Sequence, residues 1–209
     1  MDLLLGLTAL SFFIPLWLLI AILIKLDSAG PILYIHRRVG RNGHEFDCFK
    51  FRTMKTGSDP NRLAESKDDD RITKLGHFLR RTSLDETPQL LNVLFGDMSM
   101  VGPRPALPVQ VNNFSEEDLW KLKTKPGITG WTQVNGRNSI PYEKRMELDC
   151  WYARHHNVFL DIWIIFKTFW VLVAGDGVYD KNSTSPVEPK VASKHLSSRS
   201  KAETESVDG

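Results

Sequence analysis

The sequence predicts a mainly helical α+β protein that is associated with a membrane. Three observations lead to this fold class: an uncharged apolar run over residues 3–24, two short strand-like segments at 32–35 and 46–51, and later segments in which apolar residues recur at helical spacing. A chain of 209 residues can bury one sizeable core, so we expect a single globular unit with appendages. The mean hydropathy of −0.24 is too polar for a transporter with many spans.

The N-terminal apolar run is long enough to enter a membrane. From Leu3 to Ile24 it covers about 22 residues, or roughly 33 Å as a helix, against roughly 30 Å for the hydrocarbon core. No basic segment precedes it and no small-residue cleavage site follows it, which argues against a signal peptide. Pro15 removes a backbone hydrogen bond near its middle, so the helix should bend, either as a kinked span or as a helix that returns to the face it entered. By the positive-inside rule, the basic residues that follow place the rest of the chain in the cytoplasm.

The two strand-like segments should form a β-hairpin, because Asn42-Gly43 between them is typical of a tight turn. On the second strand, Lys50 and Arg52 project from the same face. This pair of cations has two interpretations, a clamp for a phosphate group or the solvated face of a hairpin, and the second is the more common outcome.

Most of the remaining chain should be short helices joined by loops. The helices are predicted at 72–81, 88–95, 115–123 and 141–155, and polar or Pro- and Gly-rich loops at 56–70, 102–105 and 126–130. Residues 158–173 are apolar and aromatic but include two charged residues and two tryptophans, which favours a helix in the membrane interface and a soluble core helix about equally. Beyond Tyr179 almost no large apolar residue remains, so this tail should be disordered.

The distribution of charge favours anionic lipids or phosphorylated substrates as partners. The net charge is only +2, but lysines and arginines are frequent between residues 37 and 104. Nucleic acid is the rival partner, and it is disfavoured because no nucleic-acid-binding motif accompanies the charge. The two cysteines lie far apart in the sequence, so they predict neither a disulfide framework nor a zinc site.

The segment from Thr82 to Pro88 carries the adjacent carboxylates Asp85 and Glu86. Ser83 and Glu86 match a capping box, so helix capping is the more probable reading of this segment by itself. A helix that starts near Thr87, with Pro88 in its first position, is the alternative. In either case the carboxylates lie at a helix N-terminus beside two arginines, a setting that attracts phosphate. A carboxylate there could attack phosphorus, with its pKa lowered by the cations and with Mg²⁺ held by Asp85.

Four segments of the chain resemble the signature blocks of the bacterial sugar transferase family. They are Lys50–Met54, Thr82–Glu86, Gly96–Pro105 and Lys125–Arg137, and they occur in order with plausible spacing. The resemblance covers roughly residues 3–179, and the chain is similar to the small, monotopic form of the family. It implies a phosphoglycosyl transferase that moves a phosphosugar from a UDP-sugar to undecaprenyl phosphate, a polyprenyl phosphate.

The resemblance also implies roles for individual residues. Asp85 matches the nucleophile that forms a covalent aspartyl-phosphosugar intermediate and releases UMP, and Glu86 matches the second member of the dyad. Lys50, Arg80 and Arg104 match cations that surround the phosphates.

Two further matches concern the nucleotide and the membrane. Arg137 matches a residue that helps to hold the nucleotide. Pro15 matches the proline that turns the membrane helix back, which favours a re-entrant helix over a span. The predicted domains are a re-entrant helix over 1–26, a catalytic domain with interfacial helices over 27–179, and a polar tail over 180–209. The expected location is the cytoplasmic face of the bacterial inner membrane.

Two other functions compete with this prediction. A metal-dependent glycosyltransferase would use the acidic triplet Asp68-Asp69-Asp70 and release UDP, although such triplets are more often simply solvated. A non-catalytic scaffold would bind anionic lipid through its basic face. The motifs predict neither the sugar of the donor nor the oligomeric state.

Overall fold

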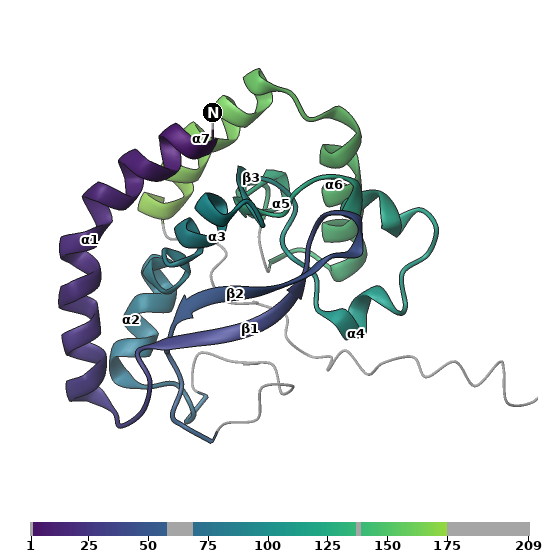
Figure 1. Ribbon diagram of the computed structural model, residues 1–209. Coiled ribbons are helices and arrows are strands. Elements are labelled where there is room, and N and C mark those ends of the chain that lie inside the picture. The colour runs from purple at the N-terminus through teal and green to yellow at the C-terminus, as the bar shows by residue number, and fades with distance from the viewer. Residues whose placement is uncertain (1, 58–68, 137–138, 175–209) are drawn as a thin grey trace, which may run out of the picture.

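Helices make up most of the structure, a computed structural model that describes residues 2–57, 69–136 and 139–174 (Figure 1). The helices are α1 (Asp2–Asp27), α2 (Lys74–Thr82), α3 (Gln89–Phe95), α4 (Pro108–Val111), α5 (Trp131–Val134), α6 (Tyr142–His155) and α7 (Val158–Ala174). The strands are β1 (Leu33–Val39), β2 (Glu45–Phe51), β3 (Ser99–Val101) and β4 (Gly127–Thr129), and three 3₁₀ turns are η1 (Arg41–Gly43), η2 (Leu84–Glu86) and η3 (Asp118–Lys123). The predicted mainly helical fold with a small hairpin is confirmed.

The hairpin forms where the turn residues predicted it. β1 and β2 are antiparallel and pair from Leu33 opposite Phe51 to Val39 opposite Glu45. Asn42 and Gly43 in the turn have φ values of 57° and 80°, a left-handed conformation that these two residue types adopt at low cost. Cys48 on β2 is fully buried, and it packs in a cluster that includes residues of α3. The hairpin is therefore fixed against the helix that follows the carboxylate pair.

A second, parallel sheet pairs β3 with β4, and β4 lies in a segment that the sequence predicted to be a loop. Ser99 on β3 lies opposite Gly127 on β4, and Val101 lies opposite Thr129. A Cβ atom at Gly102 or Gly127 would collide with the backbone of the other segment, so glycine is needed for this close approach. The sheet therefore fixes the loop at 102–105 against the segment that begins at Lys125.

α1 runs for 26 residues through Pro15, and Figure 1 shows that it bends part-way along its length. Both ends of α1 contact the rest of the molecule. Near its start, Asp2 Oδ2 accepts a hydrogen bond from Ser99 Oγ at 2.9 Å. Near its end, Ile20 and Ile24 are buried in a cluster with residues of β2 and α2. Within the described residues, α1 is the one helix long and apolar enough to cross a membrane.

α1 and α7 expose large apolar side chains, and both run along the same outer side of the molecule in Figure 1. Ile164 of α7 is fully buried, and this buried side packs against β3 and the buried Tyr152. The opposite side of α7 is exposed and aromatic. α7 is therefore buried on one side only, and its exposed apolar side is large enough to be a contact surface. The exposed members of this apolar surface are Leu3, Leu4, Leu5, Leu7, Phe12, Ile14, Leu18, Leu19, Ile22, Leu23 and Leu26 of α1 and Val158, Phe159, Ile162, Trp163, Phe166, Phe169 and Trp170 of α7.

The other predicted helices lie close to their expected positions, with one exception. α2, α3 and α6 match the predictions to within a few residues, and Gly96 ends α3 with a φ of 89°. The helix predicted over 115–123 is a 3₁₀ turn from Asp118 onward, and Ser115 and Asp118 bond to each other just before it. Residues 58–68 of the predicted polar loop and the predicted tail lie outside the described residues.

Candidate active site

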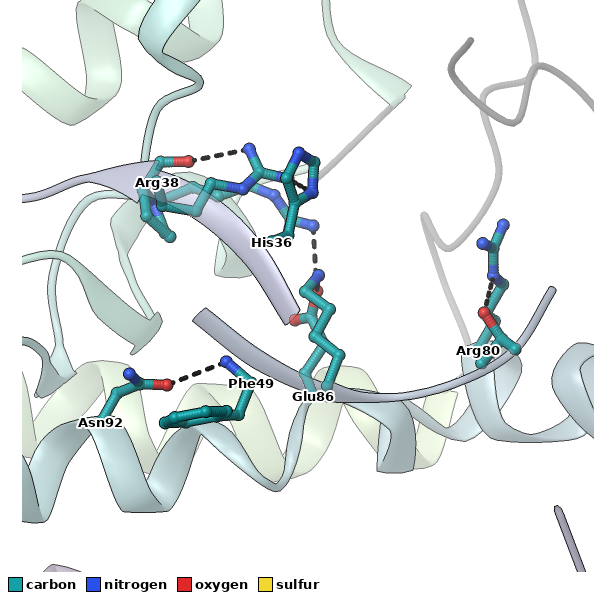
Figure 2. A network of polar contacts seen from close by, with 10 residues as sticks. His36, Arg38, Phe49, Arg80, Glu86 and Asn92 are labelled. Atoms are coloured by element: carbon teal, nitrogen blue, oxygen red, sulfur yellow. Dashed lines mark hydrogen bonds and ion pairs between the residues drawn. The ribbon is translucent and has the colours of Figure 1, made fainter. Parts of the chain in front are cut away.

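Three segments far apart in the sequence meet at Glu86. Lys50 Nζ from β2 donates to Glu86 Oε1 at 2.6 Å, and Arg104 Nη2 from the loop after β3 donates to the same oxygen at 3.0 Å (Figure 2). The side chains of Lys50 and Glu86 are 16% and 20% exposed, so this ion pair is largely shielded from water. The structure therefore brings together three of the predicted site residues.

The backbone around the carboxylates differs from the predicted capping box. Ser83 is the last residue of the turn that ends α2, in a left-handed conformation, and its side chain caps nothing. Asp85 and Glu86 occupy the 3₁₀ turn η2, and Pro88 directly precedes the start of α3 at Gln89. The capping-box interpretation is wrong, because the Ser83 side chain makes no capping hydrogen bond and α3 begins only at Gln89. The alternative start near Thr87 is close to the observed one.

The two carboxylates have opposite electrostatic environments. Glu86 has Arg104 and Lys50 within hydrogen-bond distance, and their charges lower its pKa well below the usual range. Asp85 makes no ion pair or hydrogen bond within the described residues, and burial together with the charge of Glu86 raises its pKa to about 6. The nearby cations do act to lower the pKa of Asp85, but burial and the charge of Glu86 outweigh them, so the prediction of a lowered pKa is wrong in its net direction.

The remaining predicted cations differ in where their side chains lie. Arg80 Nε donates to Thr53 Oγ1 at 2.9 Å, and its charge acts to lower the pKa of Asp85, so it belongs to the site. Arg52 is buried and donates to the backbone oxygens of Ser28 and Ala29, both at 2.7 Å. The interpretation of Lys50 and Arg52 as a joint phosphate clamp is wrong, because Arg52 instead closes the turn after α1. Arg137 lies outside the described residues.

Sequence reasoning missed two groups around the site. Asn92 is fully buried, accepts from the Phe49 backbone N–H and donates to the Asp47 carbonyl, so it fixes β2 beside Lys50. His36 and Arg38 on β1 are in contact with each other, and Figure 2 shows them next to the group around Glu86. Strand alternation would have placed His36 and Arg38 on one face of β1, but whether that face is turned towards the site depends on tertiary packing.

The residues present fit a magnesium ion at Asp85. Mg²⁺ prefers oxygen ligands and is usually held by one or two carboxylates together with substrate phosphates. The half-buried Asp85 carboxylate, with no cation bonded to it in the described chain, has that chemistry. By contrast, Asp69 of the acidic triplet is bound by Arg71 at 2.6 Å, and the described residues contain no cluster of three or more potential metal ligands.

Comparison with known proteins identifies the family. The family model described as bacterial sugar transferase matches residues 1–175. The chain belongs to this family. It is 44% identical over 168 residues to an undecaprenyl-phosphate galactose phosphotransferase of Salmonella typhimurium, covering 73% of this chain and 35% of that relative. It is 40% identical over 194 residues to a UDP-galactose-lipid carrier transferase of Erwinia amylovora, covering 85% and 40%.

A third relative is of similar length to this chain. The exopolysaccharide production protein ExoY of Rhizobium meliloti is 38% identical over 194 residues, which cover 85% of this chain and 86% of the relative. The chain spans only about two fifths of the length of the first two relatives, at 35% and 40%. The four segments that resemble the signature blocks of the family all fall inside the matched residues 1–175.

Proposed function

We propose that this chain is a phosphoglycosyl transferase that moves a sugar phosphate from a UDP-sugar to a polyprenyl phosphate and releases UMP. The observation that carries the proposal is Asp85, a half-buried carboxylate without a bonded cation in the described chain, close to the positive charges of Lys50, Arg80 and Arg104. The names of two relatives describe transfer of this kind, to undecaprenyl phosphate or to a lipid carrier. Membership of the bacterial sugar transferase family supports the same reaction class.

The reaction would proceed in two steps through Asp85. In the first, a carboxylate oxygen of Asp85 bonds to the β-phosphorus of the donor, the bond from that phosphorus to the bridging oxygen breaks, and UMP leaves with the electron pair. In the second, an oxygen of the acceptor phosphate bonds to the same phosphorus and the bond to Asp85 breaks. The carboxylate is thereby regenerated. With a pKa of about 6, Asp85 is mostly ionised at neutral pH and is more basic than an ordinary aspartate.

Glu86 would act by holding cations. Its two bonds, to Lys50 and Arg104, fix these groups beside Asp85 without neutralising Asp85 itself. Its strongly lowered pKa makes it a weak base, so a role in proton transfer is disfavoured. Asp85, with substrate phosphate oxygens, would hold Mg²⁺. When bound there, Mg²⁺ would neutralise charge on the diphosphate.

We further propose that α1 is re-entrant and anchors the catalytic domain to the cytoplasmic face of the inner membrane. Asp2 bonds to Ser99 and Ile24 is buried against the same domain, so the two ends of α1 lie on one body. A span would place them on opposite membrane faces. The exposed apolar side of α1 and α7 would contact lipid. In inside-out vesicles, an impermeant maleimide should label Asp2→Cys and Asp27→Cys equally; labelling of Asp27→Cys alone would indicate a span.

The decisive experiment compares two aspartates in a UMP-release assay on purified protein with a panel of UDP-sugars. Asp85→Asn should lower the rate by at least about 10³-fold, as loss of a nucleophile does. Asp70→Asn, a change to an exposed aspartate of the acidic triplet, should leave the rate unchanged. Without acceptor, intact-mass measurement should show a sugar-phosphate adduct that Asp85→Asn lacks. Release of UDP, with sensitivity to Asp70→Asn, would instead establish the metal-dependent glycosyltransferase.

A further inference from the structure

Arg38 on β1 is a largely buried guanidinium without a carboxylate partner in the described part of the chain. Its Nη1 donates to the Pro105 carbonyl oxygen and its Nη2 lies against His36 Nδ1, both at 3.3 Å. Its Nε is buried and has no hydrogen-bond partner among the described residues. Burial and the charge of the neighbouring Arg104 lower the pKa of Arg38. An uncompensated buried cation costs stability, so its presence beside a candidate site indicates a ligand.

His36 adds a neutral hydrogen-bond donor to the same place. Burial and the charges of Arg38 and Lys50 lower its pKa to about 4, so the imidazole is neutral at physiological pH. Arginine can only donate, so His36 Nδ1 must accept from Arg38 and the ring proton must be on Nε2. A neutral histidine with this tautomer presents an N–H group beside the guanidinium.

The charges around the carboxylate pair do not balance. Arg38, Lys50, Arg80 and Arg104 are four cations, and Asp85 and Glu86 are two carboxylates, which leaves two positive charges. Lys50 and Arg104 both bond to one oxygen of Glu86, so the charge of this carboxylate is already shared between two other cations and leaves Arg38 uncompensated. A ligand that carries charge on two linked groups would complete this arrangement.

We propose that Arg38, assisted by His36, forms a second phosphate subsite beside the one at Asp85 and Glu86. Arg104 lies between the two subsites, because it is bonded to Glu86 and is close enough to Arg38 for their charges to interact. The guanidinium of Arg38 presents its outer N–H groups in the planar arrangement that phosphate oxygens accept. If the proposed transferase activity is correct, this subsite receives either the nucleotide-linked phosphate of the donor or the phosphate of the acceptor.

The competing account is that Arg38 merely ties β1 to the loop at Pro105. The two accounts predict opposite changes in the stability of the ligand-free protein. Arg38→Gln removes a buried unpaired charge, so its unfolding midpoint should equal or exceed that of the wild type if Arg38 serves a ligand. A structural tie would lower the midpoint. Arg37→Gln is a matched control, because Arg37 directly precedes Arg38 on β1 and pairs with Glu45 and Asp47 on the exposed face.

The direct test is calorimetric binding of pyrophosphate and orthophosphate to the full chain. Arg38→Gln should weaken pyrophosphate binding about 10- to 100-fold, the value of one or two charged hydrogen bonds. It should weaken orthophosphate binding much less, because one phosphate can occupy the subsite at Asp85 and Glu86. Arg38→Lys, which keeps the charge but not the planar donors, should fall between wild type and Arg38→Gln, and Arg37→Gln should bind as wild type does.

The binding of pyrophosphate and orthophosphate also gives the results that would overturn the proposal. Equal weakening of both would place Arg38 in a single phosphate site, and no weakening, or a lower midpoint alone, would make it structural. A kinetic assay then distinguishes the source of the phosphate. If the subsite receives the phosphate of the donor, Arg38→Gln raises the KM for the UDP-sugar in acceptor-free UMP release. If it receives the phosphate of the acceptor, Arg38→Gln raises only the KM for the polyprenyl phosphate. The binding test stands even if the wild type releases no UMP, so the two proposals fail separately.

Discussion

Lys121 and Asp149 form a buried ion pair on one side of the molecule, whereas the cations around Asp85 and Glu86 outnumber the carboxylates. Lys121 and Asp149 are 11% and 3% exposed and lie 2.8 Å apart, and Thr132 donates a further hydrogen bond to Asp149. One cation meets one carboxylate, and the contact joins η3, α5 and α6. The pair is complete without a ligand, so its role is to hold these elements together.

The cluster at Asp85 and Glu86 is built differently. Asp85 has no bonded cation in the described chain, Glu86 has two, and Arg38 has no carboxylate. A cluster of this kind lowers the stability of the free protein and gains its compensation when an anion binds. In this protein, the balance between cations and carboxylates, more than their burial, distinguishes the structural cluster from the candidate binding site.

The largest expected effect is on stability at the balanced pair. Asp149→Ala leaves Lys121 buried without a partner, so the free energy of unfolding should fall by about 3–5 kcal/mol. Chemical denaturation measures this change. Glu147→Ala on the same helix is the control, because Glu147 pairs with Lys144 in an exposed contact and should change stability by less than about 1 kcal/mol. Equal effects of the two variants would contradict the structural role of Asp149.

The next largest effect is on activity at the unbalanced cluster. Lys50→Met removes a cation beside the proposed reaction centre, so UMP release should slow by about 10²- to 10³-fold, as when one electrostatic donor is lost. Stability should change far less than in Asp149→Ala, because Arg104 still pairs with Glu86. Lys144→Met, at an exposed lysine, is the control for both measurements. If Lys50→Met instead lowers the stability and leaves the rate of UMP release unchanged, the cluster at Asp85 and Glu86 is structural, as the pair of Lys121 and Asp149 is.

Local patterns predicted the fold where short-range chemistry decides it. The hairpin followed from Asn42-Gly43, and α3 from its apolar spacing and the glycine after it. The pairing of β3 with β4 could not be predicted, because its strands are three residues long and Val101 meets Thr129 only through tertiary packing. A strand of three residues is too short to show a detectable alternation of apolar and polar side chains.

At the candidate site, the sequence predicted which residues gather but not how charge is shared among them. Lys50 and Arg52 look equivalent on one strand face, yet one reaches Glu86 and the other reaches backbone oxygens after α1. Likewise, adjacent carboxylates in a sequence give no sign of which will receive the cations. The raised pKa of Asp85 depends on that choice, which only the three-dimensional arrangement contains.

A smaller effect is expected at the amide that positions Lys50. Asn92→Ala leaves the Phe49 N–H and the Asp47 carbonyl without their partner, so the free energy of unfolding should fall by about 1–3 kcal/mol. Asn113→Ala is the control, because Asn113 is exposed and bonds only to the Val109 carbonyl in its own turn. Hydrogen exchange should quicken at Phe49 in the first variant only. Unchanged exchange there would show that other contacts suffice to hold β2.

The smallest expected effect is on pH dependence, and it tests the electrostatic difference between the carboxylates. Because Asp85 must be ionised to attack, UMP release should rise with pH through about 6 and level off above it. Glu86→Gln removes the charge that raises the pKa of Asp85 and frees Lys50 and Arg104 to face it, so the rise should move to lower pH. Glu147→Gln should leave the profile unchanged. A rise that stays near pH 6 in Glu86→Gln would mean that burial alone sets the pKa of Asp85, and a rise at higher pH would mean that another group titrates.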